Sequence, residues 1–334
     1  MNATFTSNPG GAADGAQASI RNFSAPLGGQ GASGAPPSNS AAAGREAGAP
    51  PPTRERTFRL DLEYEGTAFE GWQRQPDART VQATVEEALA RIVSAPVGVV
   101  GAGRTDAGIH AEAMTASFVA ATALAERDLA RALDALLPED VGVLSVREMP
   151  EGFHALRDAH WKWYRYDVLR SRFRRVARRR SSWRVGAAID LEALRAGAAA
   201  LVGRRDFAAF QNAGSPRRST VRTLAGLAWS EHGEVLRLDA VADGFLYGMV
   251  RAIVGTLVEV GRGRRRAASL AEVVASRDRT RAGPAAPACG LTLVRVGYAE
   301  DHAPAFVDPA LRAALESGRA HGPSPREDPD GCRS

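Results

Sequence analysis

Apolar and polar residues alternate along residues 58–64, as they do in a strand with one buried face. Comparable strand patterns recur at 97–102, 113–119, 141–147, 160–169, 222–230, 235–241 and 291–298. Apolar residues at helical spacing predict helices at 80–92, 126–137, 190–202, 246–260 and 268–276. Many consecutive strands lie too close in sequence for a helical crossover, so antiparallel pairing must be common. The pattern therefore predicts an α+β fold rather than a doubly wound parallel sheet.

The two ends of the chain lack this patterning. Residues 1–55 are dominated by Ala, Gly, Ser, Pro and Asn, and they carry too few large apolar side chains to offset the entropy cost of ordering. Residues 301–334 are polar and rich in proline. We therefore expect a disordered extension over 1–55, a folded region over 56–300 and a flexible tail over 301–334.

Charge and cysteine content narrow the possible functions only slightly. The chain has 43 Lys and Arg residues against 38 Asp and Glu, a net charge of +5 that suits a polyanionic partner without establishing one. Cys289 and Cys332 form no C-x-x-C pair, which argues against a zinc site and a disulfide scaffold. We therefore expect no metal site. No apolar run is long enough to span a membrane, and we expect a cytoplasmic protein.

The densest polar and glycine-rich segment of the folded region is Gly-Arg-Thr-Asp-Ala-Gly at 103–108, directly after a predicted strand. Two glycines allow a tight turn and a close approach to a ligand. From its surroundings alone, Asp106 is more often a turn residue that binds its own backbone than a catalytic group. The loop becomes informative only when it is considered together with the rest of the chain.

Several motifs occur in a fixed order along the sequence. Residues 64–75 read Tyr-x-Gly-x-x-Phe-x-Gly-Trp-Gln-x-Gln, and residues 103–111 read Gly-Arg-Thr-Asp-Ala-Gly-Ile-His-Ala. Further segments lie at 80–82, 153–155, 161–166, 203–210, 220–223, 244–255 and 290–296. In composition and order this set resembles the tRNA pseudouridine synthase A family, and the matches cover residues 57–298.

This resemblance implies a pseudouridine synthase fold, in which helices flank a largely antiparallel or mixed central sheet and a catalytic cleft separates two α+β subdomains. It implies a homodimer that isomerises uridine to pseudouridine in the anticodon stem-loop of tRNA, at positions 38 to 40, without a cofactor. Asp106 would be the catalytic carboxylate, Arg251 its charged partner and Tyr164 the ring that stacks on the target base. Arg104 would hold the RNA backbone or fill the place of the flipped base.

The residues around Arg251 support a buried role independently. Arg251 lies in an otherwise apolar helical stripe, where an unpaired charge would be costly to bury, although a long side chain can also reach solvent. Asp106 must be ionised at neutral pH, and a nearby guanidinium would favour this by lowering its pKa.

Three points stay open from sequence. The chain departs from the family pattern at Glu112–Thr115 and at Tyr247–Gly248, and both departures bear on the rim of the pocket. A run of arginines over 170–184 is either a solvated loop or a contact surface for tRNA phosphates. The main alternative function is a catalytically inactive RNA-binding protein with the same fold.

Overall fold

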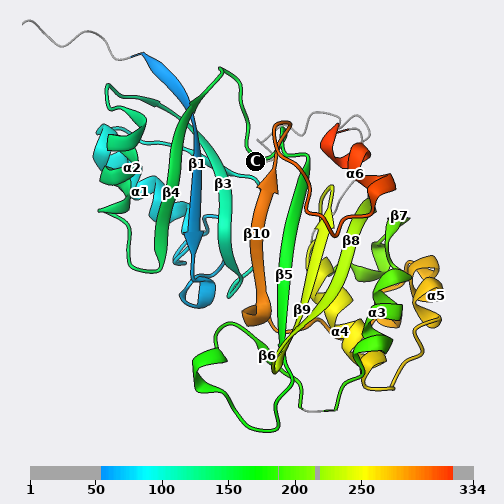
Figure 1. The fold of residues 1–334 in the computed structure, drawn as a ribbon. Coiled ribbons are helices and arrows are strands. Elements are labelled where there is room, and N and C mark those ends of the chain that lie inside the picture. Colours follow the sequence, from blue (N-terminus) through cyan, green and yellow to red (C-terminus); the bar gives the residue numbers. More distant parts are fainter. Residues whose placement is uncertain (1–53, 187, 215–218, 319–334) are drawn as a thin grey trace, which may run out of the picture. The chain divides into compact units, whose positions relative to one another are not determined.

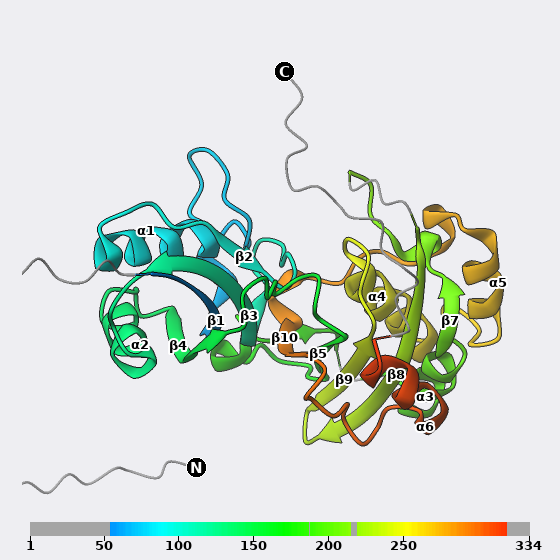
Figure 2. The ribbon, with the colours of Figure 1, turned by 90° about the horizontal axis from the view of Figure 1, so that it is seen from above.

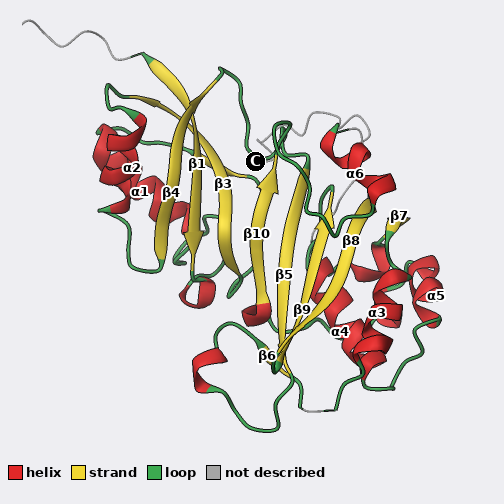
Figure 3. Ribbon diagram, viewed as in Figure 1, coloured by secondary structure: helices red, strands yellow, loops and turns green. Residues whose placement is uncertain are grey.

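The computed structural model describes residues 54–186, 188–214 and 219–318. This part of the chain forms a ten-stranded mixed sheet flanked by six α-helices (Figures 1 and 3). The predicted α+β fold is therefore confirmed. Most of the expected extension over 1–55 and the last part of the expected tail lie outside the described residues.

The strands follow one continuous order, β4-β1-β3-β10-β5-β9-β8-β7, with β2 paired to β3 and β6 paired to β5. Their bounds are β1 Glu55–Tyr64, β2 Val99–Gly101, β3 His110–Ala121, β4 Val141–Met149, β5 Trp161–Leu169, β6 Trp183–Arg184, β7 Gly203–Asp206, β8 Val221–His232, β9 Val235–Ala242 and β10 Leu291–Gly297. The pairs β10–β3 and β5–β6 are parallel, and the other strand pairs are antiparallel.

Helices pack beside both halves of the sheet. Their bounds are α1 Val81–Val93, α2 Glu126–Asp134, α3 Leu191–Ala199, α4 Met249–Gly261, α5 Ser269–Ser276 and α6 Pro309–Glu316. Seen from above, α1 and α2 lie beside β1 to β4, while α3, α4 and α5 lie beside β7 to β9 (Figure 2). Thr80 caps α1 by accepting a hydrogen bond from the backbone N–H of Ala83, so the helix begins where the sequence predicted.

The last strand of the sheet in sequence is central in space. β10 pairs with β3 on one side and with β5 on the other, so it joins the two halves of the sheet. The loop that contains Asp106 precedes β3, and Tyr164 lies on β5. Asp106 and Tyr164 are almost 60 positions apart in sequence, yet only one strand, β10, lies between the strands β3 and β5 to which they belong or lead.

The described part of the expected flexible tail is ordered and packed, which contradicts the sequence interpretation for residues 301–318. Val307 and Leu315 are buried with Trp161 in a second, smaller core cluster. The prolines suggested a loop, but Pro309 occupies the first turn of α6, where proline is well tolerated. Asp308 caps this helix by accepting a hydrogen bond from Ala310. Residues 319–334 lie outside the described range.

Candidate active site

The 103–108 loop is held by the segment that follows β1. The backbone N–H of Trp72 donates to the carbonyl of Thr105 at 2.9 Å, and that of Gly108 donates to Phe69 at 3.3 Å. The hydroxyl groups of Tyr64 and Thr105 form a buried hydrogen bond of 2.8 Å. The two sequence motifs at 64–75 and 103–111 are therefore one structural unit, in which the first supports the second.

Gly71 shows why this support needs a residue without a side chain. Its φ of 93° lies in the left-handed region, and a Cβ there would lie 2.6 Å from the carbonyl oxygen of Thr105. Any other residue would be strained by the backbone conformation and would push the loop away. The position of Asp106 thus depends on a glycine 35 residues earlier in the chain.

His110 fastens the end of the loop. Its Nδ1 accepts a hydrogen bond of 3.1 Å from the backbone of Gly66, and its Nε2 lies 2.7 Å from the carbonyl oxygen of Arg180. These two bonds require the tautomer with a proton on Nε2, which donates to Arg180. His110 therefore connects the start of β3 with two other segments, and its role here is structural.

Asp106 and Arg251 meet across the site, as the resemblance implied. Nη1 of Arg251 lies 3.7 Å from Oδ2 of Asp106, and the two side chains are 23% and 24% exposed. Burial raises the pKa of Asp106, while the charge of Arg251 opposes this rise. Arg251 thus lowers the pKa of Asp106, as expected, but desolvation is the larger effect and the net shift is upward.

Arg251 is fixed through both its side chain and its backbone. Its Nε donates to the carbonyl of Ala286 at 2.7 Å, and its backbone carbonyl accepts a bond of 2.9 Å from the N–H of Ala286. The segment around Ala286 lies so close to α4 that a Cβ on Gly255 would be 1.7 Å from the carbonyl oxygen of Pro284. A glycine one turn after Arg251 thus lets the anchoring segment approach the helix.

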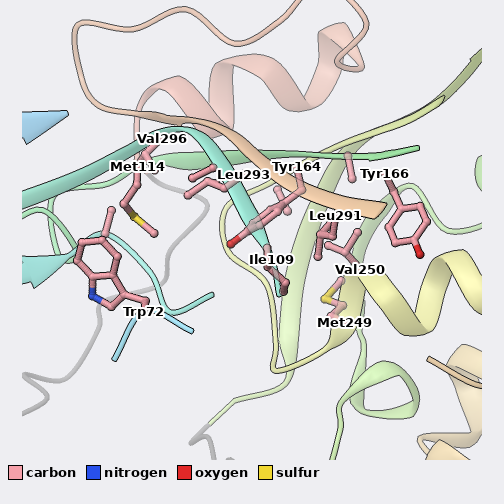
Figure 4. Packing of buried hydrophobic residues seen from close by; sticks show 14 of the residues in the cluster. Trp72, Ile109, Met114, Tyr164, Tyr166, Met249, Val250, Leu291, Leu293 and Val296 are labelled. Carbon is pink, nitrogen blue, oxygen red and sulfur yellow. The ribbon is translucent and has the colours of Figure 1, made fainter. Parts of the chain in front are cut away.

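Tyr164 is 7% exposed and packs edge-on against Phe245, with ring centres 5.1 Å apart. Its pKa is raised by burial and, in addition, by the negative charge of Asp106, which places the two residues in one electrostatic environment. Figure 4 shows Tyr164 among Ile109, Leu293 and Val250 in the core between the two halves of the sheet.

Tyr166, two residues along β5, is a packing residue. It is fully buried, and its hydroxyl donates to the carbonyl of Pro287 at 2.7 Å. A buried tyrosine whose polar end is already satisfied by the protein has no group left to offer a substrate. This agrees with the usual role of a tyrosine in a strand and distinguishes Tyr166 from Tyr164.

Arg104 lies on the same loop as Asp106 but does not join this group. It is exposed and forms no ion pair within the described ranges. The structure thus brings Asp106, Arg251 and Tyr164 together and leaves Arg104 at the solvent-facing side of the loop.

Sequence reasoning assigned no role to Tyr64 or Phe245, although both lay inside the quoted motifs. Tyr64 holds the loop through Thr105, and Phe245 contacts the ring of Tyr164. Sequence reasoning also missed Ala286, which acts through its backbone and leaves no trace in the side-chain pattern. Tyr64 could have been found, because a tyrosine at the buried end of a strand needs a partner for its hydroxyl.

One residue of each departure from the family pattern, Glu112 and Gly248, has a local structural role. Glu112 pairs with Arg165 at 2.9 Å, and Arg165 points to the opposite face of β5 from its neighbour Tyr164. Glu112 therefore lies on the face of the sheet opposite the Tyr164 ring. Gly248 is the N-cap residue of α4 with a φ of 67°, and a Cβ on it would collide with the side chain of Asn212.

Other possible sites lie elsewhere. Two surface hollows of about 800 and 350 Å³ are lined by residues within 74–87 and within 63–142, and neither includes Asp106, Tyr164 or Arg251. Within the described ranges, no group of His, Cys, Asp and Glu side chains could hold a metal ion. No helix in that part of the chain has the length and apolar character needed to cross a bilayer.

The sequence profile of a family described as tRNA pseudouridine synthase matches residues 62–156 and 198–299. The tRNA pseudouridine synthase A of Pelobacter propionicus is 40% identical over 243 residues, which are 73% of this chain and 100% of the relative. The enzyme of the same name from Syntrophotalea carbinolica is 44% identical, over 72% of this chain and 96% of the relative. This chain belongs to the tRNA pseudouridine synthase A family.

Membership in this family confirms the resemblance seen in the motifs. A third tRNA pseudouridine synthase A, from Myxococcus xanthus, is 44% identical over 72% of this chain and 91% of its own length. The first stretch matched by the profile contains Asp106, the second contains Arg251, and Tyr164 lies between the two stretches. The geometry adds that the two matched stretches meet at the Asp106–Arg251 pair.

Proposed function

We propose that this protein isomerises uridine to pseudouridine in tRNA, with Asp106 as its catalytic carboxylate. The reaction detaches uracil from C1′ of the ribose, turns it and rejoins it through C5, so it involves no net redox change. The observation that carries the proposal is the partly buried Asp106, paired with Arg251 at 3.7 Å in a chain of this family. The protein is accordingly an isomerase that needs no cofactor.

Asp106 must be ionised whether it acts as a nucleophile or as an acid–base group. Burial raises its pKa, and the fixed charge of Arg251 works against that rise. Because Nε of Arg251 is already held by Ala286, the guanidinium meets Asp106 with little freedom to turn away. Arg251 therefore keeps the carboxylate charged and oriented in a desolvated place.

Tyr164 and Arg104 complete the proposed site. An aromatic ring is a natural platform for a base taken out of its stack, and Phe245 holds the Tyr164 ring by an edge contact. Arg104 is exposed two residues before Asp106, where a guanidinium can contact the nucleotide backbone or replace the flipped base.

The family resemblance extends the proposal to finer points. We propose uridines at positions 38 to 40 of the anticodon stem-loop as the targets, and a homodimer in which one tRNA contacts both subunits. We also propose a cytoplasmic location and a catalytic cleft between two subdomains of the 56–300 region. Sedimentation of the protein with and without tRNA tests the homodimer.

The decisive experiment is to incubate the protein with unmodified tRNA and to map pseudouridine at single-nucleotide resolution. Asp106→Asn should form no product, whereas Asp128→Asn, at an exposed aspartate of α2, should match the wild type. Product formation by Asp106→Asn at the wild-type rate would overturn the role of Asp106. Binding without any single-turnover product from the wild type would instead favour the catalytically inactive RNA-binding protein.

A further inference from the structure

The segment 170–184, here called the arginine loop, follows β5, ends with the short strand β6 and contains the longest run of basic residues. Every residue from Arg172 to Ser181 is exposed. In Figure 1 the loop extends beyond the ends of the strands near β6. Packing in the core does not explain the composition of ten successive exposed residues.

Ion pairing divides the arginines of this loop into two groups. Three are paired: Arg170 with Glu231, Arg175 with Glu234 and Arg180 with Glu65. The others have no carboxylate within ion-pair distance among the described residues, and these are Arg172, Arg174, Arg178, Arg179 and Arg184. A loop whose only role is to be solvated gains nothing from keeping its cations unpaired and close together, because like charges repel.

Two large apolar side chains stand among these cations. Phe173 is 68% exposed and Val176 is 71% exposed. The guanidinium of Arg172 lies 5.8 Å from the centre of the Phe173 ring, which leaves most of that ring free. An exposed aromatic ring between unpaired arginines is the combination found where proteins stack on a base and contact the adjoining phosphates.

The C-terminal end of the arginine loop is attached to the proposed active site. The carbonyl of Arg180 accepts the hydrogen bond from His110, the residue that begins β3 two positions after the 103–108 loop. The carbonyl of Ser182, which is buried, accepts a long bond of 3.7 Å from the thiol of Cys289. Cys289 follows Ala286, the anchor of Arg251, by three residues. These two hydrogen bonds attach the arginine loop to the segment that contains Asp106 and to the segment that anchors Arg251.

We propose that the arginine loop is a docking surface for tRNA, in which Arg172, Arg174, Arg178 and Arg179 contact phosphates and Phe173 stacks on an unpaired base. This inference rests on the proposed function and names the part of the surface that holds the substrate.

RNA fits this surface better than a second copy of the chain does. In a two-fold contact the same patch faces itself, so the unpaired arginines would be brought against one another. Nearby acidic groups could relieve this repulsion, but Glu231 and Glu234 are already engaged with Arg170 and Arg175. A polyanion neutralises all of these charges at once.

Salt dependence tests the phosphate contacts. Dissociation constants for unmodified tRNA are measured over a range of salt concentrations with the wild type and with a variant carrying Arg172→Gln, Arg174→Gln, Arg178→Gln and Arg179→Gln. The slope of log affinity against log salt should shrink by roughly 0.7 to 0.9 for each phosphate that the variant no longer neutralises. KM should rise while kcat at saturating tRNA stays near the wild-type value.

A matched control removes the same charge from other elements. Arg91→Gln, Arg127→Gln, Arg131→Gln and Arg157→Gln act on exposed arginines of α1, α2 and the β4–β5 connection that have no carboxylate partner among the described residues. This variant should keep most of the wild-type slope. Equal slopes for the two quadruple variants would overturn the docking surface and leave only an effect of net charge.

Phe173→Ser tests stacking separately. Affinity should fall roughly 5- to 150-fold, the range for removing one stacked base, while the salt slope stays unchanged because no charge is removed. Wild-type affinity would refute stacking, and a shift from dimer to monomer in sedimentation would assign the residue to a contact between copies. If the wild type modifies tRNA and the loop variants do so with wild-type KM, this inference fails while the proposed function stands; if the wild type forms no pseudouridine, the proposed function itself fails.

Discussion

Arg251 approaches Asp106 to 3.7 Å while its Nε stays bonded to the carbonyl of Ala286. The guanidinium therefore has two tasks, since one edge is used for anchoring and another faces the carboxylate. This division explains why lysine is a poor substitute at this position: a single ammonium group cannot keep the fixed geometry of a fork.

Replacing Arg251 should change the pH dependence of the reaction. The pKa of Asp106 is raised by burial, and the charge of Arg251 limits the rise. Arg251→Met removes that charge, so the pKa should rise further and the acid limb of kcat/KM should move to higher pH. Arg251→Lys should shift the limb less. Both should lower kcat/KM, Arg251→Met by on the order of 100-fold. Measurement of kcat/KM against pH checks this, and an acid limb that does not move in Arg251→Met would contradict it.

Asp106→Asn should stabilise the fold at neutral pH. The pKa of Asp106 is higher in the folded chain than its ordinary value because burial disfavours the charged form. The stability that this group contributes is therefore fully present below the ordinary aspartate pKa and is lost as pH rises through the raised one. The free energy of unfolding of Asp106→Asn should exceed that of the wild type near pH 7, and the difference should shrink towards pH 4. Urea titrations at both pH values measure it; a less stable variant at pH 7 would show that pairing outweighs burial.

The Tyr64–Thr105 hydrogen bond should be a coupled pair. Tyr64→Phe leaves the buried Thr105 hydroxyl without this partner, which costs about 1–3 kcal/mol. Thr105→Val should also destabilise, but the double variant should recover part of the loss, with a coupling of about 0.5–3 kcal/mol. Tyr247→Phe, at an exposed tyrosine, is the control and should be neutral. Urea unfolding of the four forms tests this, and strictly additive losses would refute the coupling.

Sequence patterns identified most of the fold because burial is periodic. Strand β1 and helix α1 alternate or repeat their apolar residues clearly, and both begin within a few residues of the expected positions. The two-residue β6 and the four-residue β7 are too short to carry a period, so the patterns missed them. α6 was missed because its prolines and charged neighbours are typical of a loop, while its buried Leu315 is visible only in three dimensions.

Only part of the candidate site could be predicted from the sequence. Asp106 by itself resembles a turn residue, and the order of the motifs is what pointed to a catalytic loop. No pattern indicates that burial outweighs Arg251 in setting the pKa of Asp106, because this depends on how closely distant segments pack. The anchoring of Arg251 by Ala286 is a backbone contact, which side-chain patterns do not record.

Tyr164 should tolerate loss of its hydroxyl but not of its ring. The ring is held by Phe245, and stacking on a base uses the ring face. Tyr164→Phe should therefore keep tRNA affinity near the wild-type value, while Tyr164→Ala should lose about 1–3 kcal/mol of binding. Binding assays with circular dichroism to confirm folding make the comparison. Equally weak binding by both variants would argue against stacking.

Gly255 should be intolerant of even one added carbon, because its position on α4 touches the segment that anchors Arg251. A Cβ would lie 1.7 Å from the carbonyl oxygen of Pro284, so Gly255→Ala must push that segment away and move Ala286 with it. The expected loss of stability is about 1–3 kcal/mol, the usual cost of overpacking. Activity should fall further than stability alone explains, since the guanidinium loses its fixed orientation towards Asp106.

The control for Gly255→Ala is Gly98→Ala, because an added Cβ at Gly98 meets no atom within 4 Å. Gly98→Ala should be neutral or should stabilise the fold by up to about 1 kcal/mol through the unfolded state. Urea unfolding and kcat/KM for unmodified tRNA are measured for both variants, at a temperature where both are folded. A Gly255→Ala variant with wild-type kcat/KM would show that the 284–286 segment does not position Arg251.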